Sequence, residues 1–275
     1  MPDDQIKTPP QPVLWVAIGR QRVGKTTLLN AAVQYFREMG SEIEVWNADQ
    51  QNRTHTLSTF FPDAKTPPAG GLTDNRMWLE QRLAEQVRHR RHAVLDAGGG
   101  LTGFSALIED VPVLETLGRH GVNVIGLFCV GPEQADLDYL GTFAETGQFL
   151  PKATAIVLNA GLVLSGRSAD AAFAAIITNS VIEAAMARGG ELVRMPALSC
   201  MSEVTDRGLS FADAAAGQVK PGQAPMSLFD PTRVGEWWTK KIPEFFAQFP
   251  REWLPLPLAG STASLSGIPV HAGDS

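Results

Sequence analysis

The sequence predicts an α/β fold, with a mostly parallel twisted sheet and helices on both of its faces. Three observations predict it. Short apolar segments of strand length alternate with segments of helical length and periodicity. The predicted strands carry few polar residues, as strands that are covered on both faces do. The chain has 275 residues, 44% hydrophobic and 19% charged, which is the composition of a globular protein with a sizeable core.

Six apolar runs predict the strands, and each run ends at a glycine, a proline or a polar turn. In chain order they are VLWVAI (13–18), IEVWNA (43–48), HAVLD (92–96), VNVIGLFCV (122–130), ATAIVLN (153–159) and LVRM (192–195). The order of strand and helix predicts a single domain over 13–254. A polar N-terminal tail over 1–12 precedes it, and a C-terminal tail over 255–275, rich in Gly, Ser and Pro, follows it.

Four helices are predicted between these strands. The first has Leu28, Leu29 and Phe36 on one face, and Gly40 is a residue at which helices commonly end. The second follows a loop rich in proline and glycine and is capped near Thr73 or Asp74. In chain order the predicted helices cover 26–39, 73–90, 133–145 and the alanine-rich 169–187.

Composition excludes several classes of protein. Lys and Arg number 23 against 29 Asp and Glu, a net charge of −6, which disfavours a protein whose whole surface binds nucleic acid. Cys129 and Cys200 are the only cysteines, and they do not build a disulfide framework or a four-ligand zinc site. No apolar run approaches the roughly 20 residues that span a bilayer, and the polar N-terminus is not a secretion signal. We therefore expect a cytoplasmic protein.

One motif lies directly after the first strand and directly before the first helix, and it matches the G-x-x-x-x-G-K-[ST] phosphate-binding loop. It is Gly19-Arg20-Gln21-Arg22-Val23-Gly24-Lys25-Thr26. In such a loop, backbone N–H groups and the helix N-terminus surround phosphates. Lys25 is expected to reach the β- and γ-phosphates, and Thr26 to ligate Mg²⁺. The alternative is an ordinary glycine turn with an incidental lysine, which the strand–loop–helix context disfavours.

The last positions of the fifth strand bear on the choice of base. A GTPase of this class carries Asn-Lys-x-Asp there, whereas this chain has Leu158-Asn159-Ala160-Gly161, without the lysine or the aspartate. The sequence therefore favours ATP.

Five segments, in the same order along the chain, resemble the ParA/MinD family of deviant Walker A ATPases. They are the phosphate loop Arg20 to Thr27, the switch-like Asn47-Ala48-Asp49-Gln50-Gln51-Asn52, the Walker B-like Val94 to Gly99, the segment Val130 to Leu137 with its Pro132-Glu133, and Met195-Pro196 through Glu203 to Ser210. The resemblance spans about 13–249. It implies a P-loop NTPase fold and a protein that positions plasmids, chromosomes, division sites or other cargo.

The resemblance also implies roles for individual residues. The catalytic positions are Lys25, Asp49, which would orient the attacking water, and Arg20, which would contact a partner's nucleotide across a dimer. Thr26 and Asp96 would hold Mg²⁺. Nucleotide contacts are expected from Gly19, Arg20, Gln21, Arg22, Val23, Gly24, Lys25, Thr26, Thr27, Gly98 and Asn159. Asp49 could instead be a strand-end turn residue, and Asn159 could instead cap the following turn.

Four positions depart from the family pattern. Arg20 replaces the signature lysine, Gln21 and Arg22 replace glycines of the loop, and Asn47 replaces the first acid of the switch segment. Arginine remains cationic, but its planar head does not occupy the space of an ammonium. We therefore expect secure binding of ATP with slow or altered hydrolysis.

These residues lead to one preferred function and two alternatives. The preferred function is an ATPase in partition or spatial positioning, which dimerises with ATP, holds non-specific DNA or another surface, and is stimulated by a protein partner. A membrane surface is disfavoured. The first alternative is a nucleotide-gated adaptor in conjugation, secretion or polar localisation with little turnover. The second is a small-molecule kinase or ligase, which would need an acceptor pocket.

Two further segments have open interpretations. The cluster Arg88, His89, Arg90, Arg91 and His92 is either a solvated helix end or a contact for DNA phosphates or an acidic partner. Later basic residues are further candidates for DNA contact: Arg167, Arg194, Arg207, Lys240 and Lys241. The aromatic segment 234–253 either packs a terminal helix onto the domain or anchors a membrane or partner.

Overall fold

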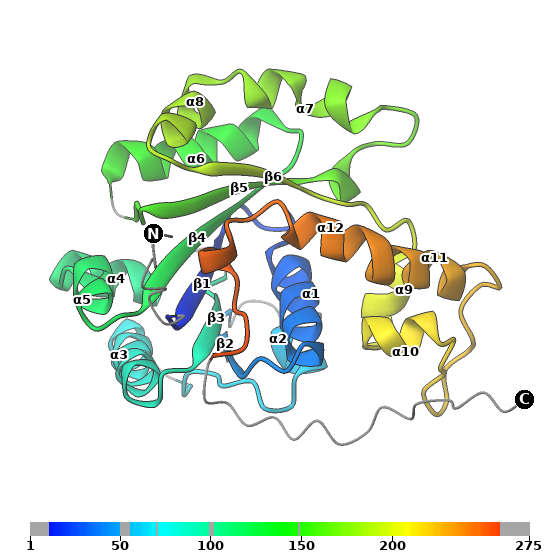
Figure 1. Ribbon diagram of the computed structural model, residues 1–275, viewed down its shortest axis with the longest axis horizontal. Helices are drawn as coiled ribbons and strands as arrows, with labels where there is room; N and C mark the ends of the chain where they lie inside the picture. The colour runs from blue at the N-terminus through cyan, green and yellow to red at the C-terminus, as the bar shows by residue number, and fades with distance from the viewer. Residues whose placement is uncertain (1–10, 50–55, 70, 99–101, 148, 259–275) are drawn as a thin grey trace, which may run out of the picture.

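Six parallel strands form the centre of the molecule (Figure 1). The computed structural model describes residues 11–49, 56–69, 71–98, 102–147 and 149–258. The sheet order is β2-β3-β1-β4-β5-β6, and every adjacent pair is parallel. The strands are β1 Val13–Ile18, β2 Ile43–Asn47, β3 His92–Asp96, β4 Asn123–Val130, β5 Ala153–Asn159 and β6 Glu191–Met195. The α/β class and all six predicted strands are confirmed, with ends that differ by at most one residue.

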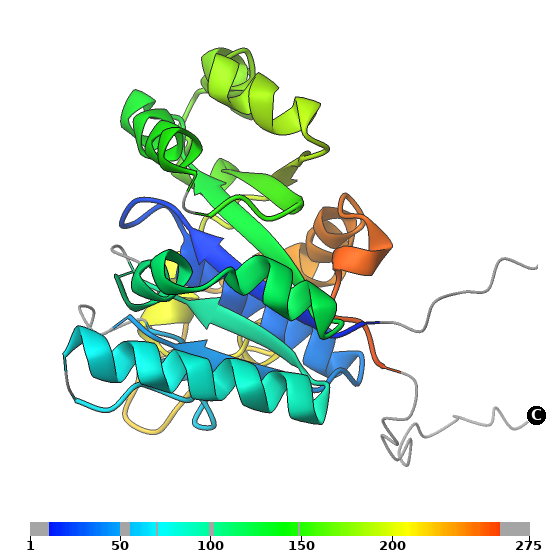
Figure 2. The ribbon, with the colours of Figure 1, turned by 90° about the vertical axis from the view of Figure 1, so that its left-hand side faces the viewer.

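Helices cover both faces of the sheet, as predicted (Figure 2). One face packs against α1, α2 and α9–α12, and the other packs against α3–α8. The helices are α1 Lys25–Glu38, α2 Leu57–Phe60, α3 Leu72–His89, α4 Thr102–Asp110, α5 Val113–Arg119, α6 Gln134–Thr146, α7 Ala169–Ile177, α8 Ser180–Ala187, α9 Met201–Asp206, α10 Phe211–Ala215, α11 Asp230–Glu236 and α12 Ile242–Phe246, with the short η1 Ala160–Leu162, the π-helical η2 Trp237–Lys241 and η3 Arg251–Trp253. The sequence did not predict α2, α4, α5 or α9–α11.

The predicted continuous helix over 169–187 is wrong. The chain forms two helices there, α7 and α8, whose axes differ by 78°. The break has a local cause, because the Asn179 side chain accepts a hydrogen bond from Val181 N (3.0 Å) and so starts a second helix. Within the described ranges no single helix is long and apolar enough to cross a membrane; α7 and α8 meet the length and composition criteria only as a bent pair.

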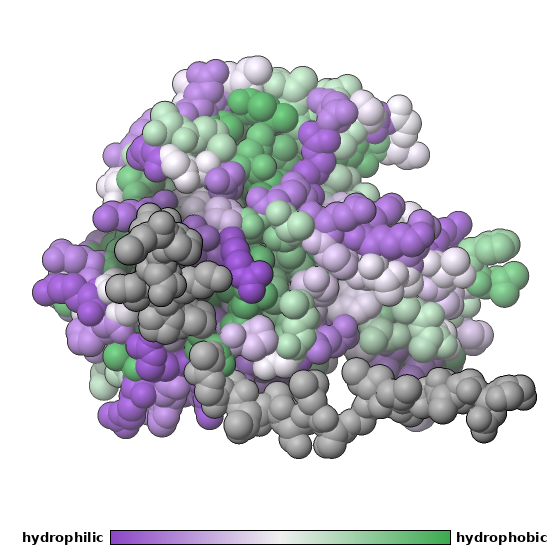
Figure 3. Space-filling model, in the orientation of Figure 1, coloured by the Kyte–Doolittle hydropathy of each residue, from purple (hydrophilic) through white to green (hydrophobic). Residues whose placement is uncertain are grey.

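The aromatic segment 234–253 packs onto the domain, which confirms the first of its two interpretations. Its rings are buried and meet Trp15, Tyr35 and Phe36 of β1 and α1. The Trp15 Nε1 donates to Trp253 O (2.7 Å) and the Trp238 Nε1 donates to Glu38 Oε2 (3.2 Å). Figure 3 shows a largely hydrophilic outer surface over α11 and α12, so the aromatic side of this segment faces the core.

The end of the described chain crosses the amino end of the sheet. His92 Nδ1 accepts a hydrogen bond from Val13 N (3.1 Å), so its Nε2 carries the proton and donates to Leu256 O (2.8 Å). Pro255 is buried. The first residues assigned to the C-terminal tail therefore contact the domain. Residues 1–10 and 259–275, which make up the rest of both predicted tails, lie outside the described part.

Candidate nucleotide-binding site

The phosphate loop joins the carboxyl end of β1 to the start of α1, and its two motif glycines are required by the backbone. Gly19 has φ +146°, and a Cβ there would lie 2.6 Å from Cys129 O. Gly24 has φ +96° and precedes the first residue of α1. A side chain at either position would strain or displace the loop. The glycine spacing therefore reflects how closely the loop is held by β4 and β5.

Lys25 lies across the loop that precedes it. Its Nζ donates to Gly19 O (2.9 Å) and to Arg20 O (2.7 Å), and the residue is 7% exposed. The ammonium thus has two main-chain acceptors that a phosphate group could replace. This is the position from which a phosphate-loop lysine can reach a bound nucleotide.

Asp96 ends β3 and faces the start of α1. Its Oδ2 accepts a hydrogen bond from Thr26 Oγ1 (2.6 Å), whereas its Oδ1 is buried and has no hydrogen-bond partner among the described residues. Burial raises the pKa of Asp96, although the Thr26 hydroxyl and the Lys25 charge lower it. The buried free oxygen and the adjacent hydroxyl are hard oxygen donors.

These donors fit Mg²⁺. The described residues contain no cluster of three His, Cys, Asp or Glu that could hold a metal ion alone. Mg²⁺ in phosphoryl-transfer sites usually keeps several waters and binds through one or two protein oxygens plus substrate phosphates. Thr26 and Asp96 would therefore suffice as protein ligands if a nucleotide supplied the rest.

The structure brings Asp49 and Gly98 together beside Asp96. Asp49 lies two residues beyond β2, and a Cβ on Gly98, which has φ +69°, would lie 3.1 Å from Asp49 Oδ1. Ala48 N donates to Asp96 O (2.8 Å), which joins the ends of β2 and β3. The Asp49 charge also raises the pKa of Asp96. The two acidic residues picked out in the sequence thus lie close together at the carboxyl end of the sheet.

Asn47, which replaces an acid of the family pattern, supports Asp49. Its Oδ1 accepts from Asp49 N (3.3 Å) and its Nδ2 donates to Ser58 Oγ (2.9 Å). The Ser58 contact could not be found from the sequence, because nothing local marks Ser58 as a partner of β2. Gln50, Gln51, Asn52 and Gly99, which the sequence also placed in this region, lie outside the described residues.

Asn159 holds the phosphate loop and caps the turn that follows β5. Its Nδ2 donates to Val23 O (2.9 Å) and its Oδ1 accepts from Gly161 N (3.0 Å). The capping interpretation is confirmed, and the bond to Val23 is an additional contact that the sequence did not predict. Contact with adenine stays a prediction.

Arg20 is held within its own chain by Glu133, in the loop after β4, and by Asp136, in the first turn of α6. Its Nη1 lies 3.2 Å from Glu133 Oε2 and 3.1 Å from Asp136 Oδ1. The Asp136 side chain is buried, and its Oδ2 accepts from Gly131 N (2.9 Å). Arg20 itself remains partly exposed. The sequence marked the segment with Glu133 and Asp136, but not its pairing with Arg20.

The structure also places the remaining loop positions and most of the basic residues that the sequence picked out. Gln21 is exposed, Arg22 has φ +66°, Val23 is buried, and Thr27 lies in the first turn of α1. His92 is buried, so it is not part of an exposed basic cluster. Several basic residues pair with acidic neighbours: Arg91 with Glu42, Arg194 with Asp170, Arg207 with Glu203 and Lys240 with Glu236.

A glycine-rich loop between a central parallel strand and a helix, with Lys25 and Thr26 facing Asp96, gives this chain the fold of P-loop NTPases. Among solved structures it is similar to the MinD cell division protein of Aquifex aeolicus (13% identity, 82% of this chain, 95% of that chain, TM-score 0.48). It is also similar to the signal recognition particle 54 kDa protein of Aeropyrum pernix in complex with GDP (14%, 90% and 51%, 0.43) and to a nucleotide-binding protein of Archaeoglobus fulgidus in complex with ADP (16%, 71% and 86%, 0.38). No family model and no curated protein sequence matches the chain.

Proposed function

We propose that the protein is a Mg²⁺-dependent, ATP-binding and slowly hydrolysing ATPase that works as a dimerisation switch in partition or positioning of DNA or another cargo. One observation carries the nucleotide-binding part of this proposal. Lys25 occupies main-chain acceptors of the phosphate loop while Thr26 bonds to Asp96, which has a buried free oxygen. Lys25 could therefore exchange its carbonyl acceptors for phosphate oxygens, and Thr26 and Asp96 could exchange their mutual hydrogen bond for a metal ion.

The chemistry follows from what each side chain can do. Lys25 would exchange the Gly19 and Arg20 carbonyls for phosphate oxygens, and Thr26 and Asp96 would hold Mg²⁺. The metal neutralises charge on the phosphates when it is bound. Asp49 would orient the attacking water, which is mainly a positioning contribution. Gly98, beside Asp49, would place a backbone group where it can respond to the γ-phosphate.

The switch part of the proposal depends on Arg20. In a dimer that holds two nucleotides, Arg20 would contact the partner's phosphates, and for this it must leave Glu133 and Asp136. DNA, or a surface of another kind, and a protein that stimulates hydrolysis are the proposed partners. The internal pairing of Arg20 favours a second candidate, the nucleotide-gated adaptor with little turnover, because this pairing opposes release of the guanidinium.

The test is the molar mass in solution, by light scattering after gel filtration, with ADP and then with ATP and Mg²⁺. Asp49→Ala should accumulate an ATP-bound dimer, and Lys25→Ala should remain monomeric and bind no nucleotide. Lys152→Ala, an exposed lysine far along the chain, is the matched control and should behave as wild type. A monomer with bound ATP would contradict the dimerisation switch, and absence of ATP binding would contradict the proposed function as a whole.

Turnover separates the two candidates. Hydrolysis that DNA and a protein partner stimulate together would favour the positioning ATPase. An ATP-dependent dimer that binds a protein partner without turnover would favour the adaptor.

A further inference from the structure

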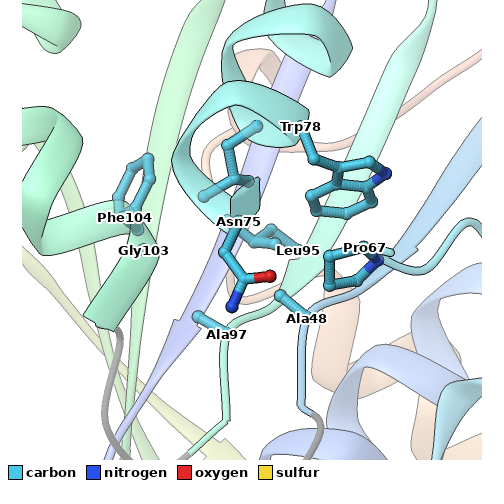
Figure 4. Close-up of a pocket in the computed structure, with 9 residues that line it drawn as sticks. Ala48, Pro67, Asn75, Trp78, Leu95, Ala97, Gly103 and Phe104 are labelled. Carbon is cyan, nitrogen blue, oxygen red and sulfur yellow. The ribbon is translucent and has the colours of Figure 1, made fainter. Parts of the chain in front are cut away.

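A small cavity lies behind the two acidic residues of the site, where α3, α4 and the ends of β2 and β3 meet (Figure 4). Its volume is about 20 Å³, which is enough for one water molecule. Most of the side chains that line it are apolar, while other atoms of the wall are polar. The lining residues are Ala48, Pro67, Asn75, Trp78, Leu79, Leu95, Ala97, Gly103 and Phe104.

Asn75 of α3 is the one lining residue with a polar side chain other than Trp78. In Figure 4 its amide group points toward Ala97 and Ala48. Its Oδ1 is buried and has no hydrogen-bond partner among the residues that the structure describes. A buried acceptor without a partner is unfavourable, whereas a water in an adjoining polar cavity satisfies it. A water in the cavity would therefore satisfy the unpaired oxygen, and this oxygen gives the water a polar group to which it can bond.

The place of this cavity links it to the site. Ala48 immediately precedes Asp49, Ala97 immediately follows Asp96, and Ala48 N donates to Asp96 O (2.8 Å). On its other side the cavity is bounded by the first turn of α4. A Cβ on Gly103 would lie 3.2 Å from Asn75 Cβ and 3.5 Å from Leu79 Cδ1, so this turn packs closely on Asn75. Asn75 thus touches α4 and faces both strand ends.

We infer that Asn75 is a positioning residue, which holds one water in this cavity and through it fixes the strand ends that carry Asp49 and Asp96 against the first turn of α4. The water supplies the donor that Asn75 Oδ1 lacks, and main-chain atoms beside Ala48 and Ala97 are its nearest candidate partners. The consequence for hydrolysis rests on the proposed function, since it requires Asp49 to orient a water. The structural part of the inference does not.

Asn75→Leu tests both parts, because leucine fills a similar volume but cannot bond to the water. In the nucleotide-free protein, amide hydrogen exchange should rise about tenfold in peptides that cover residues 47–49 and 96–98, the factor for losing one hydrogen bond worth about 1.4 kcal/mol. With ATP and Mg²⁺, kcat should fall about tenfold while the Kd for ATP stays within about twofold, since Asn75 acts through Asp49 and not on the phosphates.

Two further variants distinguish positioning from a general loss of packing. Leu79→Met changes the apolar wall of the same cavity and should leave exchange and kcat near wild type. Asn75→Ser keeps an uncharged acceptor for a water and should restore part of the protection that Asn75→Leu loses.

Each outcome decides the inference. Unchanged exchange at 47–49 and 96–98 in Asn75→Leu overturns it, and so does a rise that is spread evenly over the whole protein with a lower urea midpoint. A wild-type protein that binds no ATP would contradict the proposed function alone, because the exchange measurement needs no nucleotide and still decides whether Asn75 fixes the two strand ends.

Discussion

At the amino end of the sheet, His92 and Trp15 bond to the main chain of the segment that closes the domain, whereas at the carboxyl end the Asp96 carboxylate bonds to another side chain and keeps one buried oxygen without a partner among the described residues. His92 and Trp15 tie the start of β3 and the middle of β1 to the closing segment through Leu256 O and Trp253 O. At the other end, Thr26 bonds to Asp96, whose second carboxylate oxygen has no partner in the described chain. Paired polar groups stabilise the fold, while an unsatisfied buried carboxylate costs stability unless a ligand satisfies it.

The difference between the two ends indicates that one end of the sheet mainly stabilises the fold and that the other end is suited to bind a ligand. The amino end is a place where substitutions should change stability and leave ligand binding alone. The carboxyl end is a place where the same kind of change should affect ligand binding and should leave stability unchanged or raise it. Four measurements can break or sharpen this comparison.

The largest expected effect is on stability at the amino end, through His92. Burial lowers the pKa of His92 from its ordinary 6.5 to about 4, because a charged ring is unfavourable away from water, while the hydrogen bond to Leu256 O acts in the opposite direction. The neutral ring is also the form whose Nδ1 can accept from Val13 N. In the unfolded chain His92 binds its proton near pH 6.5, so its contribution is fully present above that pH and is lost as the pH falls toward 4. At 1.36 kcal/mol per pKa unit the loss is about 3 kcal/mol.

Urea unfolding of wild type and His92→Phe between pH 7.5 and 4 measures this effect. Phenylalanine does not titrate, so the difference in unfolding free energy between the two proteins should shrink as the pH falls through this window. Parallel curves would show that His92 does not set the pH dependence. Nucleotide affinity at pH 7.5 should be the same in both proteins.

A slightly smaller effect, with opposite signs on binding and stability, is expected for Asp96→Asn at the carboxyl end. Asparagine can still accept from the Thr26 hydroxyl, but it carries no charge for Mg²⁺. The affinity for ATP with Mg²⁺ should fall about 100-fold, or about 2.7 kcal/mol. Since burial raises the pKa of Asp96, its ionised form destabilises the folded protein, and the nucleotide-free variant should unfold at an equal or higher urea concentration. A less stable nucleotide-free variant would indicate a structural carboxylate and break the comparison.

Asn159 should give an intermediate effect, because it belongs to both the fold and the site. Asn159→Ala removes the cap on Gly161 N and the bond to Val23 O of the phosphate loop, and ATP affinity should fall about tenfold, the factor for one hydrogen bond. Asn179→Ala is the matched control, since Asn179 caps α8 in the same way without touching the loop. Calorimetric titration of both variants with ATP tests this, and equal losses of affinity would mean that the Val23 bond is unimportant.

Much of this arrangement could be predicted from the sequence, because the signals are local. Each apolar run fixed a strand, and the spacing of Gly19, Gly24, Lys25 and Thr26 located the phosphate loop. The strand-end positions of Asp49 and Asp96 placed both at the carboxyl edge, where parallel strands end together. The structure brings these residues together as expected.

What the sequence could not supply are contacts between distant segments. Arg20 and Asp136 lie 116 positions apart, and no local pattern marks them as a pair. The split of the helix over 169–187 depended on whether Asn179 would cap a new helix or lie within one continuous helix, and an alanine-rich composition does not decide between these. A third contact that the sequence could not supply covers the edge strand β6, and its loss gives the smallest predicted effect.

Gln248 covers the free edge of β6 with a single side chain. Its Oε1 accepts from Arg194 N (2.9 Å) and its Nε2 donates to Arg194 O (3.3 Å), so the amide takes the place of a neighbouring strand. Gln248→Ala should cost about 1 kcal/mol of unfolding free energy, leave ATP affinity unchanged, and raise the tendency of the edge to pair between molecules. Gln248→Glu keeps the acceptor and loses the donor, so its cost should be about half as large. Urea midpoints measure the first effect, and light scattering at increasing protein concentration measures the second. A variant with wild-type stability and no association would show that β6 is protected without Gln248, and that the stabilising side-chain contacts lie mainly at the amino end of the sheet.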